Sequence, residues 1–402
     1  MNELSSLGLI LLLALLAGHV VQFLRIPEVT GYVLAGVALG PSVLGWVSGE
    51  NLTALEVISE VALGLILFSI GSVFEFERFR LVGRRIVGMT LMESLPAAVL
   101  VFVGILLLGQ PWQVAALLGA TAISTAPAST LMVMRECDAA GPLSDALLRI
   151  MAVNNILCLI VFSLVAALIE VTGGPQGAAI LETLHRSGYG LVWQLIGSAA
   201  LGFLVGLMLA GWATKVHERG EMLILLAGSI LLCVGAARIL DLSALVASMA
   251  VGATMANLSR RSRRLFETLA GTHPPFYAIF FVIAGADLDV TLVPTMGILG
   301  GVYVIARAAG KFFGARSGAG RMAMPEPVRR YLGFGLLAQA GLAVGLTLVV
   351  DQRFPDIAAP IRVVVLASVV IHEMLGPIGT RFAIVRAGEA RLRKAEPESI
   401  WA

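Results

Sequence analysis

Charged side chains are scarce in this 402-residue chain, in which Asp, Glu, Lys and Arg together make up 13% and hydrophobic residues 58%. The mean hydropathy is +0.92. So few polar side chains cannot cover the surface of a water-soluble fold of this size, so we expect an integral membrane protein. The apolar stretches are continuous and do not alternate over ten residues. They therefore predict membrane-spanning helices and not a β-barrel.

Cysteine is also rare. Cys137, Cys158 and Cys233 are too few and too scattered for a disulfide framework or a zinc site. The sequence has no nucleophile triad, phosphate loop or metal-ligand spacing, so we expect neither an enzyme nor a cofactor. The net charge is only +2 and the basic residues lie beside helix ends, which argues against a nucleic-acid partner. No basic region precedes the first apolar segment, which favours a retained helix over a signal peptide.

Thirteen apolar segments are candidate membrane spans. They lie near residues 4–24, 30–47, 54–74, 85–109, 113–134, 143–170, 189–213, 221–240, 243–258, 274–287, 295–315, 329–350 and 358–384. Of the 28 Lys and Arg residues, 22 fall in one set of alternate loops, and the other set holds only Arg186, Arg238, Arg353 and Arg362. Because Lys and Arg are enriched in cytoplasmic loops, we expect the amino terminus outside and the carboxyl terminus in the cytoplasm.

The fifth span is interrupted at its centre by residues 124–130, with the sequence STAPAST. Pro127 lacks an amide hydrogen and disfavours helical geometry at the residue before it. Such a break at mid-membrane is tolerated where it lines a wet, protein-walled cavity, as at the ion sites of transporters with broken helices. Ser124, Thr125 and Ser129 are therefore candidate ion-binding residues. The alternative is a proline-kinked helix whose free backbone groups bond to its own Ser and Thr hydroxyls.

The spans divide into six, one and six, and the two sets of six share paired motifs. ALGLILFSIGSVFEFERF in the third span matches FYAIFFVIAGADLDVTLV in the tenth. Because seven spans precede the second set, it enters the membrane in the opposite direction, which predicts an inverted repeat. The expected units are residues 1–170 (first repeat), 171–219 (linker helix), 220–386 (second repeat) and 387–402 (cytoplasmic tail).

The repeat pairs the broken fifth span with the twelfth, where Gln339, Gly341 and Gly345 are expected to loosen the helix at mid-depth. The other glycine pairs with the same spacing are expected to mediate close helix packing. They are Gly36/Gly40, Gly202/Gly206 and Gly310/Gly314.

Ionisable residues at membrane depth are functional candidates because each is costly to bury without a partner. Glu93 in the fourth span and Arg307 in the eleventh occupy equivalent depths in the two repeats and have opposite charges, so we predict an ion pair between them. Its role is open between a static clamp and a part in transport. Lys311, one turn beyond Arg307, is expected to extend toward the cytoplasmic edge.

Two further polar clusters lie in apolar spans. Glu373, beside His372 in the thirteenth span, is a candidate proton carrier or a cap for the free backbone of the twelfth. Asn154 and Asn155 in the sixth span can supply oxygens to a cation or join helices, but they cannot carry a proton. They are expected to face the crossing of the broken helices, near Thr125, Ser129 and Gln339.

The order of these motifs resembles bacterial monovalent cation/proton antiporters of the sodium/hydrogen exchanger superfamily. The broken segment ATAISTAPASTLMVMRE, GPLSDALLRIMAVNN, LAQAGLAVGL and HEMLGPIG carry the resemblance, which covers residues 4–386. It implies an all-α integral membrane fold with two crossing broken helices, a homodimer in the bacterial inner membrane, and an elevator-like motion that carries Na⁺ or K⁺ in exchange for protons. The lipid bilayer is its setting, and no metal is expected beyond the transported cation.

The sequence departs from this family at one important place. Cation/proton exchangers of the family usually have Asp-Asp or Asn-Asp where this chain has Asn154-Asn155. Arg307 matches the basic residue that pairs with such an aspartate, so the resemblance leaves Glu93 or Glu373 as substitutes. Three functions remain open: cation/proton exchange, an uncoupled carrier or channel for a cation or another solute, and a non-transporting sensor or subunit.

Overall fold

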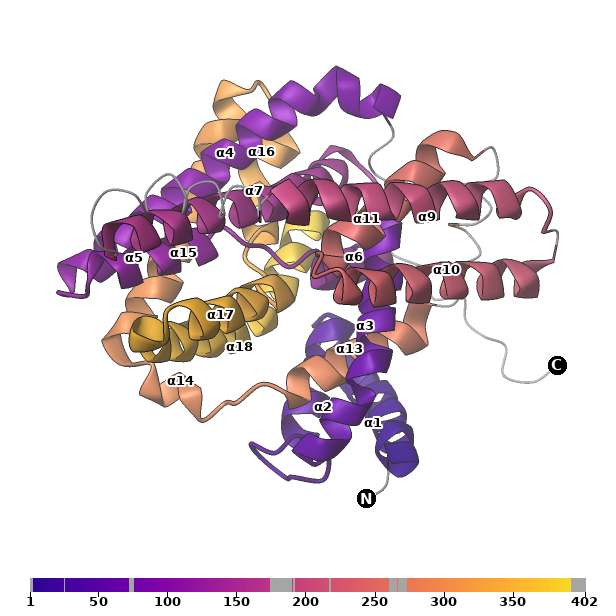
Figure 1. Cartoon of the computed structure of the whole chain (residues 1–402), viewed down its shortest axis with the longest axis horizontal. Coiled ribbons are helices and arrows are strands. Elements are labelled where there is room, and N and C mark those ends of the chain that lie inside the picture. The colour runs from indigo at the N-terminus through magenta and orange to yellow at the C-terminus, as the bar shows by residue number, and fades with distance from the viewer. Residues whose placement is uncertain are drawn as a thin grey trace.

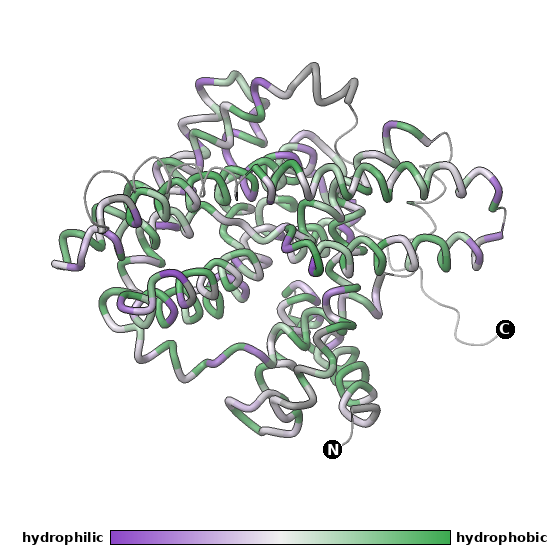
Figure 2. Tube along the Cα trace, in the orientation of Figure 1, coloured by the Kyte–Doolittle hydropathy of each residue, from purple (hydrophilic) through white to green (hydrophobic). Residues whose placement is uncertain are grey.

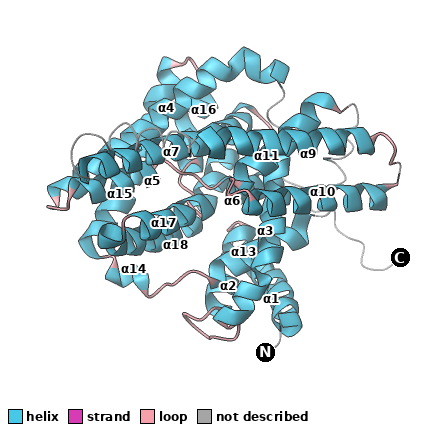
Figure 3. Ribbon diagram, in the orientation of Figure 1, coloured by secondary structure: helices cyan, strands magenta, loops and turns pink. Residues whose placement is uncertain are grey.

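In the computed structural model, the regular structure of the described residues is helical, and Figure 3 draws no strand among them. The structure describes residues 3–24, 26–71, 76–173, 190, 192–216, 218–259, 266 and 273–391. Within this part, seven helices are long and apolar enough to cross a membrane, and five shorter helices are also apolar. Hydrophobic residues make up most of the long helices, and many of the hydrophilic ones lie near helix ends and loops (Figure 2). The expected class, an all-helical membrane protein, is confirmed.

The helices of the first half are α1 (Glu3–Phe23), α2 (Glu28–Leu39), α3 (Gly49–Gly71), α4 (Phe76–Leu107), α5 (Trp112–Thr121), α6 (Pro127–Glu136) and α7 (Pro142–Gly173). A π-helical turn, η1 (Trp193–Gly197), leads into α9 (Ser198–Ala213), α10 (Arg219–Ile239) and α11 (Ala244–Leu258). The remainder is α13 (His273–Ala286), α14 (Leu292–Thr295), α15 (Gly297–Arg321), α16 (Glu326–Gly335), α17 (Gly341–Arg353) and α18 (Pro355–Arg386). Every expected span overlaps at least one of these helices. Parts of the expected linker (174–189) and tail (392–402) lie outside the described residues.

The helices pack as two bundles (Figure 1). The scaffold bundle comprises α1, α2, α3, α9, α10, α11 and α13, and the core bundle comprises α4, α5, α6, α7, α15, α16, α17 and α18. The most extensive contact in the molecule joins α4 to α15 inside the core bundle. Each bundle therefore combines helices from both halves of the chain.

Two pairs of short helices replace two continuous spans, and their breaks meet. The first break separates α5 from α6, and the second separates α16 from α17. The amide of Ala126 donates to the carbonyl of Ala338 across the crossing, at 3.0 Å. Because Ala126 has extended backbone angles and α6 begins at Pro127, the fifth span is broken and the kinked-helix alternative is wrong.

The second break lies slightly before the glycines that the sequence pointed to. It covers residues 336–340 and includes Gln339, whereas Gly341 begins α17 and Gly345 lies within it. The expectation that Gly345 loosens the helix is wrong. Glycine permits an irregular backbone but does not require one, and the break forms where side chains from other helices bond the free carbonyls.

Close approach of two backbones explains the glycine pairs. A Cβ added at Gly36 would lie 2.9 Å from the Cα of Gly285, and one added at Gly71 would lie 2.9 Å from the Cα of Gly252. The other pairs are similar: Gly202 and Gly206 face α11, and Gly310 and Gly314 face α4. An added Cβ at Gly341 or Gly345 would meet no atom within 4 Å. The prediction that the other glycine pairs mediate close helix packing, and that Gly341 and Gly345 do not, is confirmed.

Gly36→Ala is therefore expected to destabilise the scaffold bundle by about 1–3 kcal/mol, the usual cost of an overpacked contact that must push two backbones apart. Gly228→Ala in α10 is the matched control, because nothing lies within 4 Å of its added Cβ. That substitution should be neutral or slightly stabilising. Thermal unfolding of the purified protein in detergent measures both, and equal melting temperatures for the two variants would contradict the packing account.

The chain after α18 turns back onto the loop between α6 and α7. The buried Glu389 carboxylate accepts the amides of Leu143 and Ser144 at 2.7 and 2.8 Å, and the Ser144 hydroxyl at 2.7 Å. It thereby caps the amino terminus of α7, where negative charge is favoured. The described start of the expected tail is thus part of the core bundle.

Candidate functional site

A fully buried ion pair lies at the centre of the core bundle. The ammonium of Lys311 on α15 lies 2.7 Å from Glu93 Oε2 on α4, and both side chains are 0% exposed. Gly314 fixes this register because its added Cβ would lie 2.9 Å from the Cα of Glu93. Lys311 is one turn from that contact, whereas Arg307 is about 10 Å away along the helix.

Two expectations are corrected by this geometry. Glu93 pairs with Lys311 and not with Arg307, and Lys311 does not extend to the cytoplasmic edge. Counting residues from the helix ends placed Arg307 and Glu93 at the same depth in the membrane. In the structure, the antiparallel packing of α4 on α15 shifts the two helices by about one turn from that expectation. Lys311 is therefore the basic residue that lies beside Glu93.

Amide and hydroxyl groups complete the surroundings of Glu93. Ser94 Oγ donates to Glu93 Oε1 at 2.6 Å, and Asn154 Nδ2 on α7 donates to the same oxygen at 2.5 Å. Asn154 Nδ2 also approaches Ser94 Oγ at 2.8 Å. The carbonyl oxygen of the Asn154 side chain has no hydrogen-bond partner among the described residues. Asn154 is thus joined directly to the buried carboxylate.

Lys311 also connects the ion pair to the first broken helix. Its ammonium donates to the carbonyl of Ile123 at 2.6 Å and to Thr125 Oγ1 at 3.0 Å. Both acceptors lie in the break after α5, where carbonyls at a helix carboxyl end carry partial negative charge. Lys311 therefore balances Glu93 and a helix end at once.

Arg307 donates hydrogen bonds to backbone carbonyls in both breaks. Its guanidinium donates to the carbonyl of Ser124 at 2.6 Å, to that of Leu337 at 2.7 Å and to that of Ala338 at 3.3 Å. These free carbonyls follow α5 and α16, so one buried cation satisfies the carboxyl ends of two half-helices. No ion pair joins Arg307 to a carboxylate among the described residues, and the predicted pair with Glu93 is replaced by this arrangement.

Arg307→Ala is expected to lower the free energy of unfolding by about 3–5 kcal/mol, because it removes the guanidinium that bonds the Ser124 and Leu337 carbonyls and leaves the Ala338 carbonyl with the Ala126 amide alone. Arg307→Lys should retain part of the stability, since an ammonium can reach one acceptor but lacks the guanidinium fork. Thermal unfolding in detergent ranks the stabilities of the wild type, Arg307→Lys and Arg307→Ala. Wild-type stability in Arg307→Ala would show that the crossing does not depend on this residue.

Gln339 links the two breaks from the other side. Its Nε2 donates to Tyr303 Oη at 2.9 Å, and to the Thr121 carbonyl and Ser124 Oγ at 3.2 Å each. Ser368 Oγ on α18 donates to Gln339 Oε1 at 3.4 Å. Gln339 and Ser124, both predicted site residues, are thus in contact.

Asn155 and Glu373 lie near the amino end of α6. Asn155 Oδ1 accepts the amide of Thr125 at 3.4 Å, whereas its Nδ2 has no partner among the described residues. Glu373 is 4% exposed and its carboxyl lies beside Ser129, although no hydrogen bond joins the two. The structure therefore brings Asn155 to Thr125 as predicted. It does not bond Asn155 to Ser129 or Gln339, nor Glu373 to the second break.

Sequence reasoning missed several contributors to this site. Ser94, Tyr303 and Ser368 were not singled out because single hydroxyls are common in membrane helices. Lys311 was noticed but assigned to the surface. Its position one turn from Arg307, on the helix face that carries Gly310 and Gly314, was the available signal for burial against α4.

The arrangement offers oxygen ligands to a small cation. Glu93 and Thr125 Oγ1 contact the Lys311 ammonium, and Asn154, whose Oδ1 is free, is bonded to Glu93. Carboxylate, amide and hydroxyl oxygens are the ligands that hard cations prefer. The part of the chain that the structure describes holds no group of three His, Cys, Asp or Glu side chains able to hold a metal ion.

Comparison with known proteins identifies the family. The family described as "Sodium/hydrogen exchanger, transmembrane" matches residues 8–384. The chain belongs to this family. The sodium/hydrogen exchanger resemblance read from the sequence motifs is therefore confirmed over nearly the whole chain, and the family consists of membrane-spanning cation/proton antiporters.

Relatives within the family carry different cations. The ammonium/H⁺ antiporter subunit AmhT of Alkalihalophilus pseudofirmus is 22% identical over 89% of this chain and 86% of its own length. A glutathione-regulated potassium-efflux system protein of Haemophilus influenzae is 28% identical over 79% of this chain, which spans about half (52%) of that relative. These relatives are transporters, which is compatible with the expectation of a non-enzyme.

Solved structures match the fold. The sodium proton antiporter MjNhaP1 of Methanocaldococcus jannaschii matches in two structures with TM-scores of 0.69 and 0.73, each at 16% identity. The matches cover 96% and 98% of this chain and 98% and 99% of the other. The chain thus shares the fold of this antiporter over nearly its whole length.

Proposed function

We propose that this exchanger moves a monovalent cation in exchange for protons, with Glu93 as the cation-binding carboxylate in place of an aspartate at Asn154 or Asn155, and with Lys311 as the residue that releases the proton. One observation carries the proposal: the buried Glu93–Lys311 pair lies against the broken helix and is bonded to Asn154. A buried carboxylate is costly to maintain in a membrane protein unless function requires it. Asn154 thus holds the acid of the neighbouring helix instead of supplying one.

Competition for Glu93 gives the coupling step. An entering Na⁺, K⁺ or NH₄⁺ takes the place of the Lys311 ammonium next to the carboxylate, with Asn154 Oδ1 and Thr125 Oγ1 as further ligands. Lys311 without its counter-charge then releases a proton, since a lone buried ammonium is strongly disfavoured. When the cation leaves on the other side, Lys311 regains a proton and the pair re-forms.

An elevator motion fits the position of these groups. Glu93, Lys311, Asn154 and their hydrogen-bond partners come from the core bundle, so the bundle can carry the site as a unit past the scaffold.

The two glycine crossings support the proposed thirteen spans and inverted repeat. Gly36 on Gly285 and Gly252 on Gly71 are equivalent contacts if spans 2 and 3 correspond to spans 9 and 10. An exterior amino terminus, the inner membrane and a homodimer remain part of this proposal.

Flux in proteoliposomes tests the exchange. With an imposed pH gradient and a fluorescent pH reporter inside, addition of Na⁺, K⁺ or NH₄⁺ is expected to dissipate the gradient, and the responding cation defines the substrate. An uncoupled carrier, which the neutral Asn154-Asn155 pair favours, would pass cations with no pH response. If no ion moves under any gradient, the transporter proposal fails and a sensor or subunit function replaces it.

Spin labels test the elevator motion. Thr214, at the end of α9 in the scaffold bundle, and Arg386, at the end of α18 in the core bundle, are both exposed and suit cysteine labelling. The distance between the two labels is expected to change between cation-free and cation-saturated protein in liposomes. A single unchanged distance under both conditions would contradict movement of one bundle past the other.

A further inference from the structure

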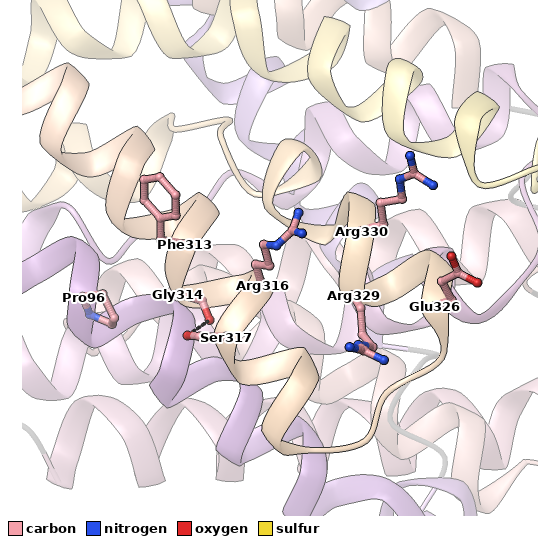
Figure 4. Close-up of a pocket in the computed structure, with 8 residues that line it drawn as sticks. All are labelled: Pro96, Phe313, Gly314, Arg316, Ser317, Glu326, Arg329 and Arg330. Atoms are coloured by element: carbon pink, nitrogen blue, oxygen red, sulfur yellow. Dashed lines mark hydrogen bonds between the residues drawn. The ribbon is translucent and has the colours of Figure 1, made fainter.

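A basic cavity opens between α15, α16 and α4, on the outside of the core bundle (Figure 4). Its volume is about 1040 Å³, and its lining residues are Pro96, Phe313, Gly314, Arg316, Ser317, Glu326, Arg329 and Arg330. Of these residues, only Gly314 also belongs to the site described above, where its backbone packs against Glu93. The space is large enough for a headgroup together with the start of its acyl chains.

Positive charge dominates the polar part of the lining. The lining holds three arginines, Arg316 on α15 and Arg329 and Arg330 on α16, and a single acid, Glu326. All three arginines are exposed, and none forms an ion pair with a carboxylate among the described residues. Guanidinium groups match phosphate oxygens in geometry and charge, so an anionic phosphate group fits this cluster.

Another part of the lining is apolar and lies on α4 and α15. Phe313 is 63% exposed and lies beside Pro96 and Gly314. Further exposed apolar side chains on the same two helices include Leu95 (46%) and Ile305 (71%). A free phosphate ion would leave this apolar part uncovered, whereas acyl chains would cover it.

We propose that this cavity binds an anionic phospholipid, whose phosphodiester contacts Arg316, Arg329 and Arg330 and whose acyl chains lie on Phe313 and Pro96. The basic loops of the chain place it in the cytoplasmic leaflet, where basic pockets between helices bind anionic headgroups. Gly314 lines the cavity and also contacts the backbone of Glu93. The bound lipid therefore braces the α4–α15 crossing that holds the ion pair.

Native mass spectrometry of the detergent-purified protein, titrated with phosphatidylglycerol, tests the binding. The variant Arg316→Gln/Arg329→Gln/Arg330→Gln is expected to bind this lipid about a hundredfold more weakly, since each of the three basic residues contributes about 1 kcal/mol to anionic-lipid binding. The matched control is Arg84→Gln/Arg85→Gln/Arg386→Gln, which removes three exposed arginines outside the cavity and should leave binding within about twofold. Phosphatidylcholine and millimolar inorganic phosphate are the ligand controls.

Three results would overturn the proposal. Equal losses of lipid binding in the two triple variants would mean nonspecific charge attraction. Equal binding of phosphatidylcholine and phosphatidylglycerol would mean that the lipid's negative charge plays no role. Displacement of the lipid by inorganic phosphate would mean that the cavity is a site for a free anion. If the cavity variant does not fold, Arg330→Gln and Phe313→Ser separately replace it, and each should weaken binding. The proposed transport activity is not needed for these measurements, so the two proposals fail independently. A lipid-dependent rise in flux, which rests on the proposed function, is a further expected result in liposomes that contain phosphatidylglycerol.

Discussion

Replacement of Glu93 by Gln is expected to abolish cation-dependent proton movement in proteoliposomes, because it removes the buried carboxylate to which Lys311 and Asn154 are both bonded. Gln keeps the size of the side chain and an acceptor oxygen, so loss of the charge is the main change. We expect no dissipation of the pH gradient with any of the cations. The variant should still elute as a single species in size-exclusion chromatography. Exchange at the wild-type rate would show that the Glu93 carboxylate is not needed for exchange.

Lys311 gives the complementary test. Lys311→Met is expected to lower the free energy of unfolding by about 3–5 kcal/mol, because Glu93 is left buried without a counter-charge. The double variant Glu93→Gln/Lys311→Met should recover most of that loss while remaining inactive. Thermal unfolding and flux on the same preparations separate stability from transport.

An exposed ion pair provides the control for these variants. Glu170 and Arg353 lie 2.7 Å apart with side chains that are 29% and 37% exposed. Glu170→Gln should cost less than about 1 kcal/mol and leave flux unchanged. Additive effects of the Glu93 and Lys311 substitutions would mean that the buried pair does not act as a unit.

Asn154→Asp is expected to change the pH profile of exchange more than any other single substitution in the sixth span. Asn154 Nδ2 lies 2.5 Å from Glu93 Oε1, so an Asp here replaces a donor with a second carboxylate at the same oxygen. Two carboxylates so close cannot both lose their protons, and the profile should move toward higher pH by about one unit or more. The pH dependence of gradient dissipation measures this shift.

Asn155→Asp is the matched comparison, since it adds the same charge one residue away. Asn155 Oδ1 accepts the amide of Thr125 and does not contact Glu93 in the described structure. A carboxylate keeps that hydrogen bond, so the substitution should shift the pH profile modestly and not create a pH dependence that was absent. If wild type shows no pH response and Asn155→Asp installs one, the natural protein is uncoupled from protons and the proposed role of Glu93 is wrong.

Local chemistry in the chain was sufficient to predict much of this site. Pro127 predicted the first break because its ring disfavours helical geometry at the residue before it, and in the structure α6 begins at Pro127. The glycine pairs at Gly36 and Gly310 predicted backbone approach because a residue without Cβ in an apolar helix has few other uses. Composition alone established a helical membrane protein.

Pairings between helices could not be predicted in this way. The sequence shows that Glu93, Arg307 and Lys311 are at membrane depth, but the partner of Glu93 depends on the register of α4 on α15, which the Gly314 contact sets. A displacement of one helical turn, about 5.4 Å, exchanges one basic residue for the other. The second break shows the same dependence: glycines near residue 341 indicated where the helix is weak, whereas Arg307 bonds the carbonyls of Leu337 and Ala338 and so decided where it opens.

The sequence by itself therefore determined the helical membrane class, the family, the first broken helix and the set of polar residues at depth, because these follow from composition, chain order and the backbone chemistry of single residues. Only the tertiary structure decided which of those residues meet. Ion pairs and helix-end contacts depend on distances of a few ångströms between segments that are more than 200 residues apart, as Glu93 and Lys311 are. Those distances follow from close packing at glycine contacts, which periodicity in one helix does not specify.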